Sequence, residues 1–182
     1  MPGTIEIETP RLLLRCHVMA DAAPLHENFG QDPAMYEYSG WNPYATLAEA
    51  EQAVSHFIES YRDPRFYGWA ITHGGRLVGT VGAYDYDPRN NTVEVGMSIE
   101  KPSWGKGFAT EALSAVLRYL TDDEGIASVV AWCASNNIGS QRALEKAGMT
   151  KVASETGALE IGEATFDKLN YEYRRTPADQ GV

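Results

Sequence analysis

The sequence predicts an α/β fold built on a mixed β-sheet. Strand-like segments outnumber helical ones, and a strand–helix–strand–helix unit at residues 92–148 lies between segments that read as hairpins. No low-complexity linker and no internal repeat interrupts the chain. We therefore expect a single domain over residues 1–175, followed by a disordered tail at residues 176–182.

The N-terminal segment reads as extended structure followed by a short helix. Residues 5–8 and 11–15 have strand-like composition and are separated by Pro10, which cannot donate to a ladder. Asp21 has the side chain of a good N-cap and is expected to start a short helix that runs to Asn28.

The middle of the chain combines a helix with a hairpin. Thr46 and Glu49 have the spacing of a capping box, and apolar residues recur at helical intervals behind them. Residues 66–72 and 76–84 then flank residues 73–75, a Gly-Gly turn signal. We expect two antiparallel strands there.

The central unit alternates strands and helices. A strand is expected at 92–99, a helix at 106–121, a near-continuous apolar strand buried on both faces at 126–133, and a helix at 139–147 that ends at Gly148. Two late strands follow, at residues 151–159 and 164–174.

The most informative stretch is Trp104-Gly105-Lys106-Gly107-Phe108-Ala109-Thr110-Glu111-Ala112, which joins a strand to a helix. Its small residues leave several backbone N–H groups uncovered at a helix start, where the macrodipole is positive, and Lys106 adds a cation. This pattern predicts a phosphate or pyrophosphate site. The alternative is a tight turn in which the glycines serve geometry alone.

Composition excludes several function classes. A net charge of −10 argues against nucleic acid as the main partner and is compatible with a cationic acceptor. No apolar run reaches the roughly 18 residues of a membrane span, and no secretory signal is visible, so we expect a cytoplasmic protein without membrane partners. Cys16 and Cys133 form no CxxC pair, and the four histidines show no metal-ligand spacing, so no metal is expected.

Three segments together resemble a known family. Residues 94–99 followed by 104–112 resemble the acyl-CoA motif of the GCN5-related N-acetyltransferase (GNAT) superfamily, and residues 137–149 are similar to its second motif. The opening residues 8–15 match the RimJ/RimL-like branch, which acetylates ribosomal-protein N-termini, spermidine and some antibiotics. The ordered set spans residues 8–175. It implies a mostly antiparallel sheet of about seven strands flanked by about four helices.

The resemblance also implies acetyl-CoA as cosubstrate. Backbone N–H groups of residues 105–110 would hold its pyrophosphate, and its pantetheine arm would run beside residues 97–99. Asn137 would bond a pantetheine amide, unless it only caps a helix; Arg142 would face adenosine phosphates, unless it is only solvated. Trp104 departs from the Gln or Arg that is common at its position. The expected cofactor-binding residues are Met97, Ser98, Ile99, Trp104, Gly105, Lys106, Gly107, Phe108, Ala109, Thr110, Asn137 and Arg142.

Two residues are candidates for catalysis. Glu94 is a carboxylate in an otherwise apolar strand and would act as a general base, directly or through water; the alternative is a structural glutamate. Ser140 corresponds to the position from which this branch reaches the CoA sulfur; the alternative is a first-turn helix serine.

An aromatic and acidic loop at residues 35–44 falls where relatives bind the acceptor. Tyr36, Glu37 and Trp41 would suit a cationic amine through charge and cation–π contacts, or they pack over the core. The predicted function is acetyl transfer to a primary amine (a protein N-terminus, a polyamine or a small amine) by direct attack on the thioester. The alternative is a non-catalytic acyl-CoA-binding or regulatory module on the same fold. A homodimer is left open.

Overall fold

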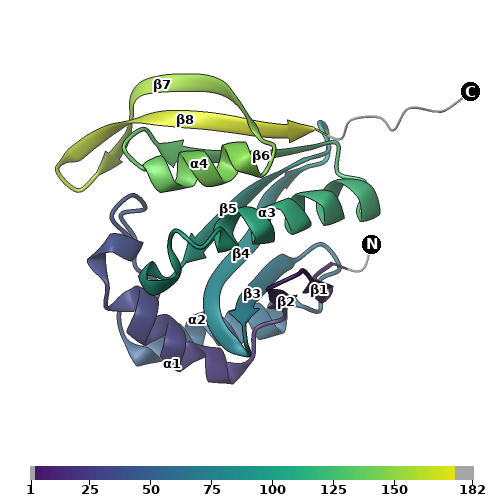
Figure 1. Cartoon of the computed structure of the whole chain (residues 1–182), viewed down its shortest axis with the longest axis vertical. Coiled ribbons are helices and arrows are strands. Elements are labelled where there is room, and N and C mark those ends of the chain that lie inside the picture. The colour runs from purple at the N-terminus through teal and green to yellow at the C-terminus, as the bar shows by residue number, and fades with distance from the viewer. Residues whose placement is uncertain (1–2, 175–182) are drawn as a thin grey trace, which may run out of the picture.

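A computed structural model describes residues 3–174, which form one eight-stranded sheet in the order β1-β2-β3-β4-β5-β6-β8-β7 (Figure 1). The strands are β1 (Ile7–Glu8), β2 (Leu13–Arg15), β3 (Tyr67–His73), β4 (Arg76–Asp87), β5 (Thr92–Ile99), β6 (Ser128–Ala134), β7 (Thr150–Ile161) and β8 (Ala164–Arg174). Only β5 and β6 are parallel neighbours. The predicted α/β class and mostly antiparallel sheet are confirmed; the tail expected at 176–182 lies outside the described residues.

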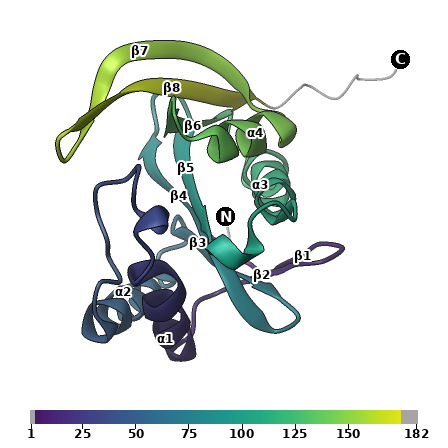
Figure 2. The ribbon, with the colours of Figure 1, turned by 60° about the vertical axis from the view of Figure 1, so that its left-hand side comes forward.

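Within residues 3–174, four α-helices cover the two faces of this sheet: α1 (Ala22–Leu25), α2 (Leu47–Ser60), α3 (Phe108–Arg118) and α4 (Ile138–Lys146). Figure 2 shows α1 and α2 on one side of the central strands and α3 and α4 on the other. The capping box of Thr46 and Glu49 starts α2, as predicted. None of the helices in the described part of the chain is both long and apolar enough to cross a membrane.

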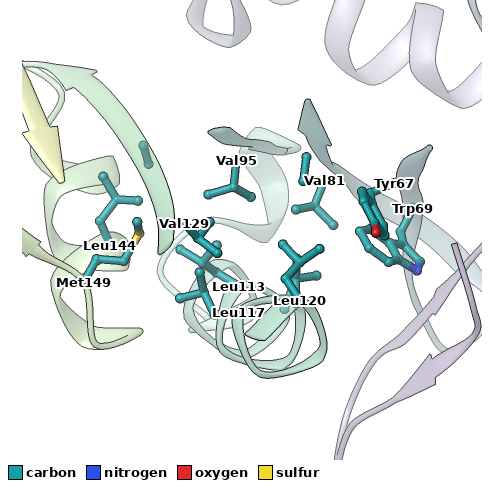
Figure 3. Packing of buried hydrophobic residues seen from close by; sticks show 14 of the residues in the cluster. Tyr67, Trp69, Val81, Val95, Leu113, Leu117, Leu120, Val129, Leu144 and Met149 are labelled. Carbon is teal, nitrogen blue, oxygen red and sulfur yellow. The ribbon is translucent and has the colours of Figure 1, made fainter. Parts of the chain in front are cut away.

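Successive side chains of β3 point to opposite faces of the sheet and pack into two separate hydrophobic cores. Trp69 and Ile71 belong to the larger core beneath α3, whereas Ala70 joins the smaller one formed with α1 and α2. In the larger core, leucines of α3 such as Leu113 pack against valines of the sheet such as Val95 (Figure 3). Every residue of β6 is buried or half-buried, which agrees with the near-continuous apolar run predicted for this strand.

Asp21 stands at the N-cap position of α1, as predicted, but its side chain does not form the predicted capping bond. Its backbone is helical (φ −75°, ψ −17°) because a 3₁₀ turn leads straight into α1, and its side chain caps nothing in that helix. The carboxylate instead receives both terminal nitrogens of Arg15 at 2.8 Å and the N–H of Val18 at 2.9 Å. A bidentate pair with a guanidinium is stronger than a neutral cap bond. The helical segment also continues past Asn28, as a π-helical turn at His26–Gly30.

The sheet opens between its two parallel strands. The register pairs Thr92–Glu94 of β5 with Ser128–Val130 of β6 and then stops. Beyond Glu94, β5 stays paired with β4, and β6 stays paired with β8 along its length. The C-terminal ends of β5 and β6 therefore diverge, and the gap between them positions the candidate site.

Candidate active site

A cavity of about 800 Å³ occupies the opening between β5 and β6. Its wall is built from both strands, the turn after β5, the first turns of α3 and α4, and the loop before α2. The predicted site residues that line it are Tyr36, Glu37, Trp41, Glu94, Met97, Ser98, Ile99, Trp104, Gly105, Gly107, Phe108, Ala109, Asn137 and Ser140. Three others, Lys106, Thr110 and Arg142, lie outside this wall, and Arg142 is exposed on α4.

The turn between β5 and α3 has a backbone shape that favours glycine. Gly105 and Gly107 have φ of 74° and 79°, in the left-handed region. Gly107 is the N-cap of α3 and has no side chain to bond the first N–H groups of the helix. Those groups carry the positive end of the helix dipole beside the cavity. The turn can therefore bind a phosphate through its backbone.

Two side chains form hydrogen bonds that fix the ends of this turn. The indole Nε1 of Trp104 donates to the carbonyl of Ile99 at 2.6 Å and ties the turn to the end of β5. The guanidinium of Arg11 donates to the carbonyl of Lys106 at 2.8 Å. The Lys106 side chain itself is exposed.

The end of β5 offers an unpaired strand edge. Met97 and Ser98 pair with Val81 and Thr80 of β4 on one side. On the cavity side, no strand of residues 3–174 pairs with this part of β5. In an antiparallel pair, alternate residues direct their N–H and C=O groups outward. This edge can therefore bond an extended ligand that carries amides.

Glu94 sits where the two strands separate. Its Oε1 accepts a hydrogen bond from the indole Nε1 of Trp132 on β6, at 2.9 Å. Tyr84 lies opposite Glu94 in the β4–β5 register, and the charge of that carboxylate acts on its hydroxyl. Both ring residues line the cavity. The sequence analysis missed Tyr84 and Trp132; for Tyr84, the register of the two antiparallel strands is the signal that identifies it.

Tyr84 keeps its proton over the working pH range of most enzymes. Nearly half of its surface is exposed, but its hydroxyl packs over Gly96, where a Cβ would lie 2.6 Å from it. Desolvation of the hydroxyl, together with the charge of Glu94, raises the pKa of Tyr84 to about 12. The phenol therefore stays neutral beside the carboxylate of Glu94.

The first turn of α4 forms the wall across from β5. Asn137 is the N-cap, and its Oδ1 accepts the N–H of Ser140 at 3.1 Å, so the capping interpretation of Asn137 is confirmed. Ser140 is half-buried and lines the cavity. Cys133 of β6 also lines it, and burial, with a smaller contribution from the charge of Glu145, raises the pKa of its thiol to about 11. That thiol stays protonated at neutral pH, which disfavours nucleophilic catalysis by Cys133.

The loop at residues 35–44 contributes to the cavity wall. It rises from the α1 and α2 side toward the β7–β8 hairpin (Figure 2). The ring of Tyr38 meets the ring of Phe166 of β8 edge-on, with centroids 5.5 Å apart. Its hydroxyl lies 3.4 Å from the carbonyl of Asn136, which it faces as a donor. At Gly40 (φ 65°), a Cβ would lie 3.0 Å from Ile161 of β7. The loop therefore forms a bridge over one end of the cavity.

Comparisons with known proteins agree with this geometry. A family model described as an acetyltransferase (GNAT) domain matches residues 11–150. The uncharacterized N-acetyltransferase YoaA of Bacillus subtilis (strain 168) is 29% identical over 147 residues, which cover 80% of this chain and 82% of the relative. A GNAT-family acetyltransferase from Bacillus anthracis superposes with a TM-score of 0.80 at 23% identity, covering 93% of this chain and 98% of that one. The ribosomal L7/L12 alpha-N-protein acetyltransferase RimL, solved in complex with coenzyme A, superposes with a TM-score of 0.84 at 18% identity, with the same coverage.

Proposed function

Because the chain belongs to the GNAT acetyltransferase family, we propose that it transfers an acetyl group from acetyl-CoA to a primary amine. The observation that carries this proposal is the convergence of three features on one cavity. These are the glycine turn at the start of α3, the unpaired edge of β5 and the carboxylate of Glu94. The first suits a pyrophosphate, the second a chain of amides, and the third a proton acceptor.

Acetyl-CoA binds, in this proposal, along the gap between the diverging strands. Backbone N–H groups of residues 105–110 hold the pyrophosphate, and the pantetheine amides bond the free edge at 97–99. Asn137 keeps one free amide nitrogen after capping α4 and donates it to pantetheine. Lys106 and Arg142 are exposed cations outside the cavity wall, and in this proposal they contact the phosphates of the adenosine part of the cosubstrate.

The chemical step is a direct attack on the thioester. The amine nitrogen forms a bond to the carbonyl carbon, and backbone N–H groups near Met97 stabilise the oxygen as it becomes negative. Before this attack, Glu94 takes a proton from the acceptor ammonium, directly or through a water, and this frees the nitrogen lone pair. After the attack the nitrogen loses a second proton, which balances the proton that the CoA thiolate takes up. The C–S bond then breaks, and the hydroxyl of Ser140 donates to the leaving thiolate. Positioning of the two substrates supplies most of the rate enhancement, so no covalent nucleophile is needed.

The acceptor is a cationic primary amine in this proposal. Two carboxylates, Glu37 and Glu94, line the same cavity as the rings of Tyr36 and Trp41. An ammonium is favoured by nearby carboxylates and by aromatic faces. A protein N-terminus, a polyamine and a small amine all have this chemistry.

Thiol release from acetyl-CoA tests the proposal. The protein is mixed with acetyl-CoA and each member of a panel of polyamines, aminoglycoside-like compounds, amino-acid analogues and short peptides with Ala or Ser at the N-terminus. We expect release above the rate without amine for at least one class, and an acetylated product of matching mass. CoA binding by calorimetry without any turnover would instead indicate a non-catalytic binding module.

A further inference from the structure

The N-terminal segment contacts the glycine turn and the first turn of α3 through side chains that the proposed chemistry leaves unused. Glu111 of α3 is the meeting point. Its Oε1 accepts the hydroxyl of Thr9 at 2.7 Å and the backbone N–H of Arg11 at 2.9 Å. Its Oε2 accepts the Nε of Arg11 at 2.7 Å. One carboxylate thus fixes two residues that are about a hundred positions away in the chain.

The guanidinium of Arg11 continues from Glu111 onto the turn itself. Its Nη1 donates to the carbonyl of Lys106 at 2.8 Å, and its carbon lies 5.0 Å from the centroid of the Phe108 ring. A Cβ built on Gly107 would lie 3.3 Å from Nη2. His73 supports the same arrangement, because its ring meets that of Phe108 and its Nδ1 lies 2.9 Å from the Arg11 carbonyl.

The bond to Lys106 has a consequence for the next peptide N–H. The described chain has no cis peptide bond, and in a trans peptide the C=O of one residue and the N–H of the next point in opposite directions. Holding the Lys106 carbonyl toward Arg11 therefore directs the N–H of Gly107 away from Arg11. Gly107 lines the cavity and Arg11 does not.

We propose that Arg11 is a positioning residue that sets the glycine turn in the conformation that binds the pyrophosphate of acetyl-CoA. This inference rests on the proposed function, because it takes the glycine turn to be the pyrophosphate site. It assigns no phosphate contact to Arg11 itself. Residues 104–107 are exposed and include two left-handed glycines, so the turn alone has many accessible conformations. Arg11 restricts them by joining the turn to Glu111.

The planar fork of arginine is required for this role. Nε of Arg11 donates to the carboxylate of Glu111, and Nη1 donates to the carbonyl of Lys106. These two acceptors lie on different segments, α3 and the glycine turn. A lysine carries the same charge but has a single nitrogen on a flexible stem, so it cannot hold both in one geometry. Charge alone is therefore not expected to replace Arg11.

The test compares two cosubstrates. Acetyl-CoA carries the pyrophosphate, and S-acetylpantetheine lacks it but has the same thioester. Arg11→Gln removes the guanidinium that joins Glu111 to the Lys106 carbonyl, and we expect kcat/KM for acetyl-CoA to fall about tenfold, mainly through KM. The value for S-acetylpantetheine should stay within about twofold of wild type, because the turn does not touch that substrate. Arg89→Gln, an exposed arginine in the β4–β5 turn outside the cavity, is the matched control and should change neither value.

Further measurements decide between the explanations. Glu111→Gln should reproduce the selective loss, and the double variant should lose less than the sum of the two. Recovery by Arg11→Lys would mean that the cation contacts a phosphate directly, and it would overturn the positioning role. Equal losses with both cosubstrates would overturn it as well. If the wild-type protein itself does not prefer acetyl-CoA over S-acetylpantetheine, the proposed pyrophosphate site fails; if it does and Arg11→Gln keeps that preference, only the role of Arg11 fails.

Discussion

The carboxylate of Glu94 receives a hydrogen bond from Trp132 at the point where β5 and β6 separate, and Tyr84 lies opposite it in the β4–β5 register. Neutral donors of this kind orient a carboxylate without neutralising it. The indole bond occupies Oε1 and leaves lone pairs of the carboxylate free toward the cavity. Glu94 is thus oriented as a proton acceptor for an amine or for a water beside it.

Replacing Glu94 with Gln should slow turnover in a pH-dependent way. Glutamine keeps the shape and still accepts a hydrogen bond from Trp132, but it cannot take a proton. We expect a loss of about a hundredfold near neutral pH, where the acceptor is an ammonium. The loss should shrink toward about pH 10, where an ordinary amine is deprotonated by solvent. Thiol-release rates of both proteins, measured across this range at saturating substrates, check the prediction.

Tyr84 does not obscure this profile, because its pKa of about 12 lies above the range of the assay. A loss that is independent of pH would show that Glu94 positions the amine without taking its proton. No loss at any pH would make Glu94 purely structural.

Replacing Ser140 with Ala should reduce kcat about tenfold while leaving CoA affinity nearly unchanged. The hydroxyl acts on the thiolate, a charge that develops only in the transition state. The helix start survives the change, because Asn137 bonds the backbone N–H of Ser140 and not its side chain. Saturation kinetics and calorimetry on the same samples measure the two effects. Equal kcat for both proteins would contradict the role in catalysis.

Individual residues differed in how well the sequence revealed them. Glu94 and Ser140 stand in contiguous motifs, and the structure brings both to the cavity wall. Tyr84 and Trp132 act through neighbours in other strands, so their role depends on a register that no local pattern contains. The position of Asp21 at the start of α1 was predicted correctly, but its side-chain partner was not, because cap propensity ignores a guanidinium six residues away in sequence.

At the scale of elements, the turn between β5 and α3 was predictable because its signal is local. Glycines at left-handed positions, a preceding strand and a following helix all lie within one stretch of sequence. The splaying of β5 from β6 was not predictable in this way. It depends on where the parallel register stops, at Glu94 and Val130, and this follows from how two whole halves of the sheet pack.

Replacing Gly107 with Val should abolish CoA binding while the fold persists. At φ 79° a β-branched residue is strained, and its Cβ would approach Nη2 of Arg11 at 3.3 Å. The turn must shift, and its N–H groups then no longer converge on a phosphate. Wild-type binding is expected at about −5 to −8 kcal/mol, so a loss of even tenfold is measurable by calorimetry.

Gly75→Val is the matched control for this variant. Gly75 has φ 78°, so its backbone strain is equal, but a Cβ there meets nothing within 4 Å and it lies in the β3–β4 turn outside the cavity. We expect similar thermal destabilisation and unchanged CoA affinity for Gly75→Val. Unchanged affinity in Gly107→Val as well would refute the pyrophosphate assignment.

At the scale of the whole molecule, the cavity depends on two cores that lie on opposite faces of one sheet. The insertion of β8 between β6 and β7 is a global property, because sequence order alone places β7 next to β6. The smaller core is joined to β2 through the ion pair between Arg15 at the end of that strand and Asp21 at the start of α1. This ion pair therefore links the N-terminal strands to the helices that carry the loop at residues 35–44.

Replacing Asp21 with Asn should destabilise the protein by about 1–3 kcal/mol at neutral pH, because it leaves a guanidinium without its bidentate partner. Desolvation of the Asp21 carboxyl acts to raise its pKa, but hydrogen bonds from Arg15 and Val18, together with the charge of Arg15, outweigh it and hold the pKa well below the ordinary value. A depressed pKa contributes stability that is complete above the unfolded value of about 3.9 and is lost as the pH falls toward the folded value. The difference in unfolding free energy between wild type and variant should therefore be constant from about pH 5 to 8 and narrow steadily below about pH 4.

Denaturant unfolding at each pH measures this difference. The control is Glu51→Gln, which changes an exposed carboxylate on α2 and is expected to show little difference from wild type. If the difference in unfolding free energy between wild type and variant stayed the same down to about pH 2, Asp21 would stabilise the fold by packing and not by its charge.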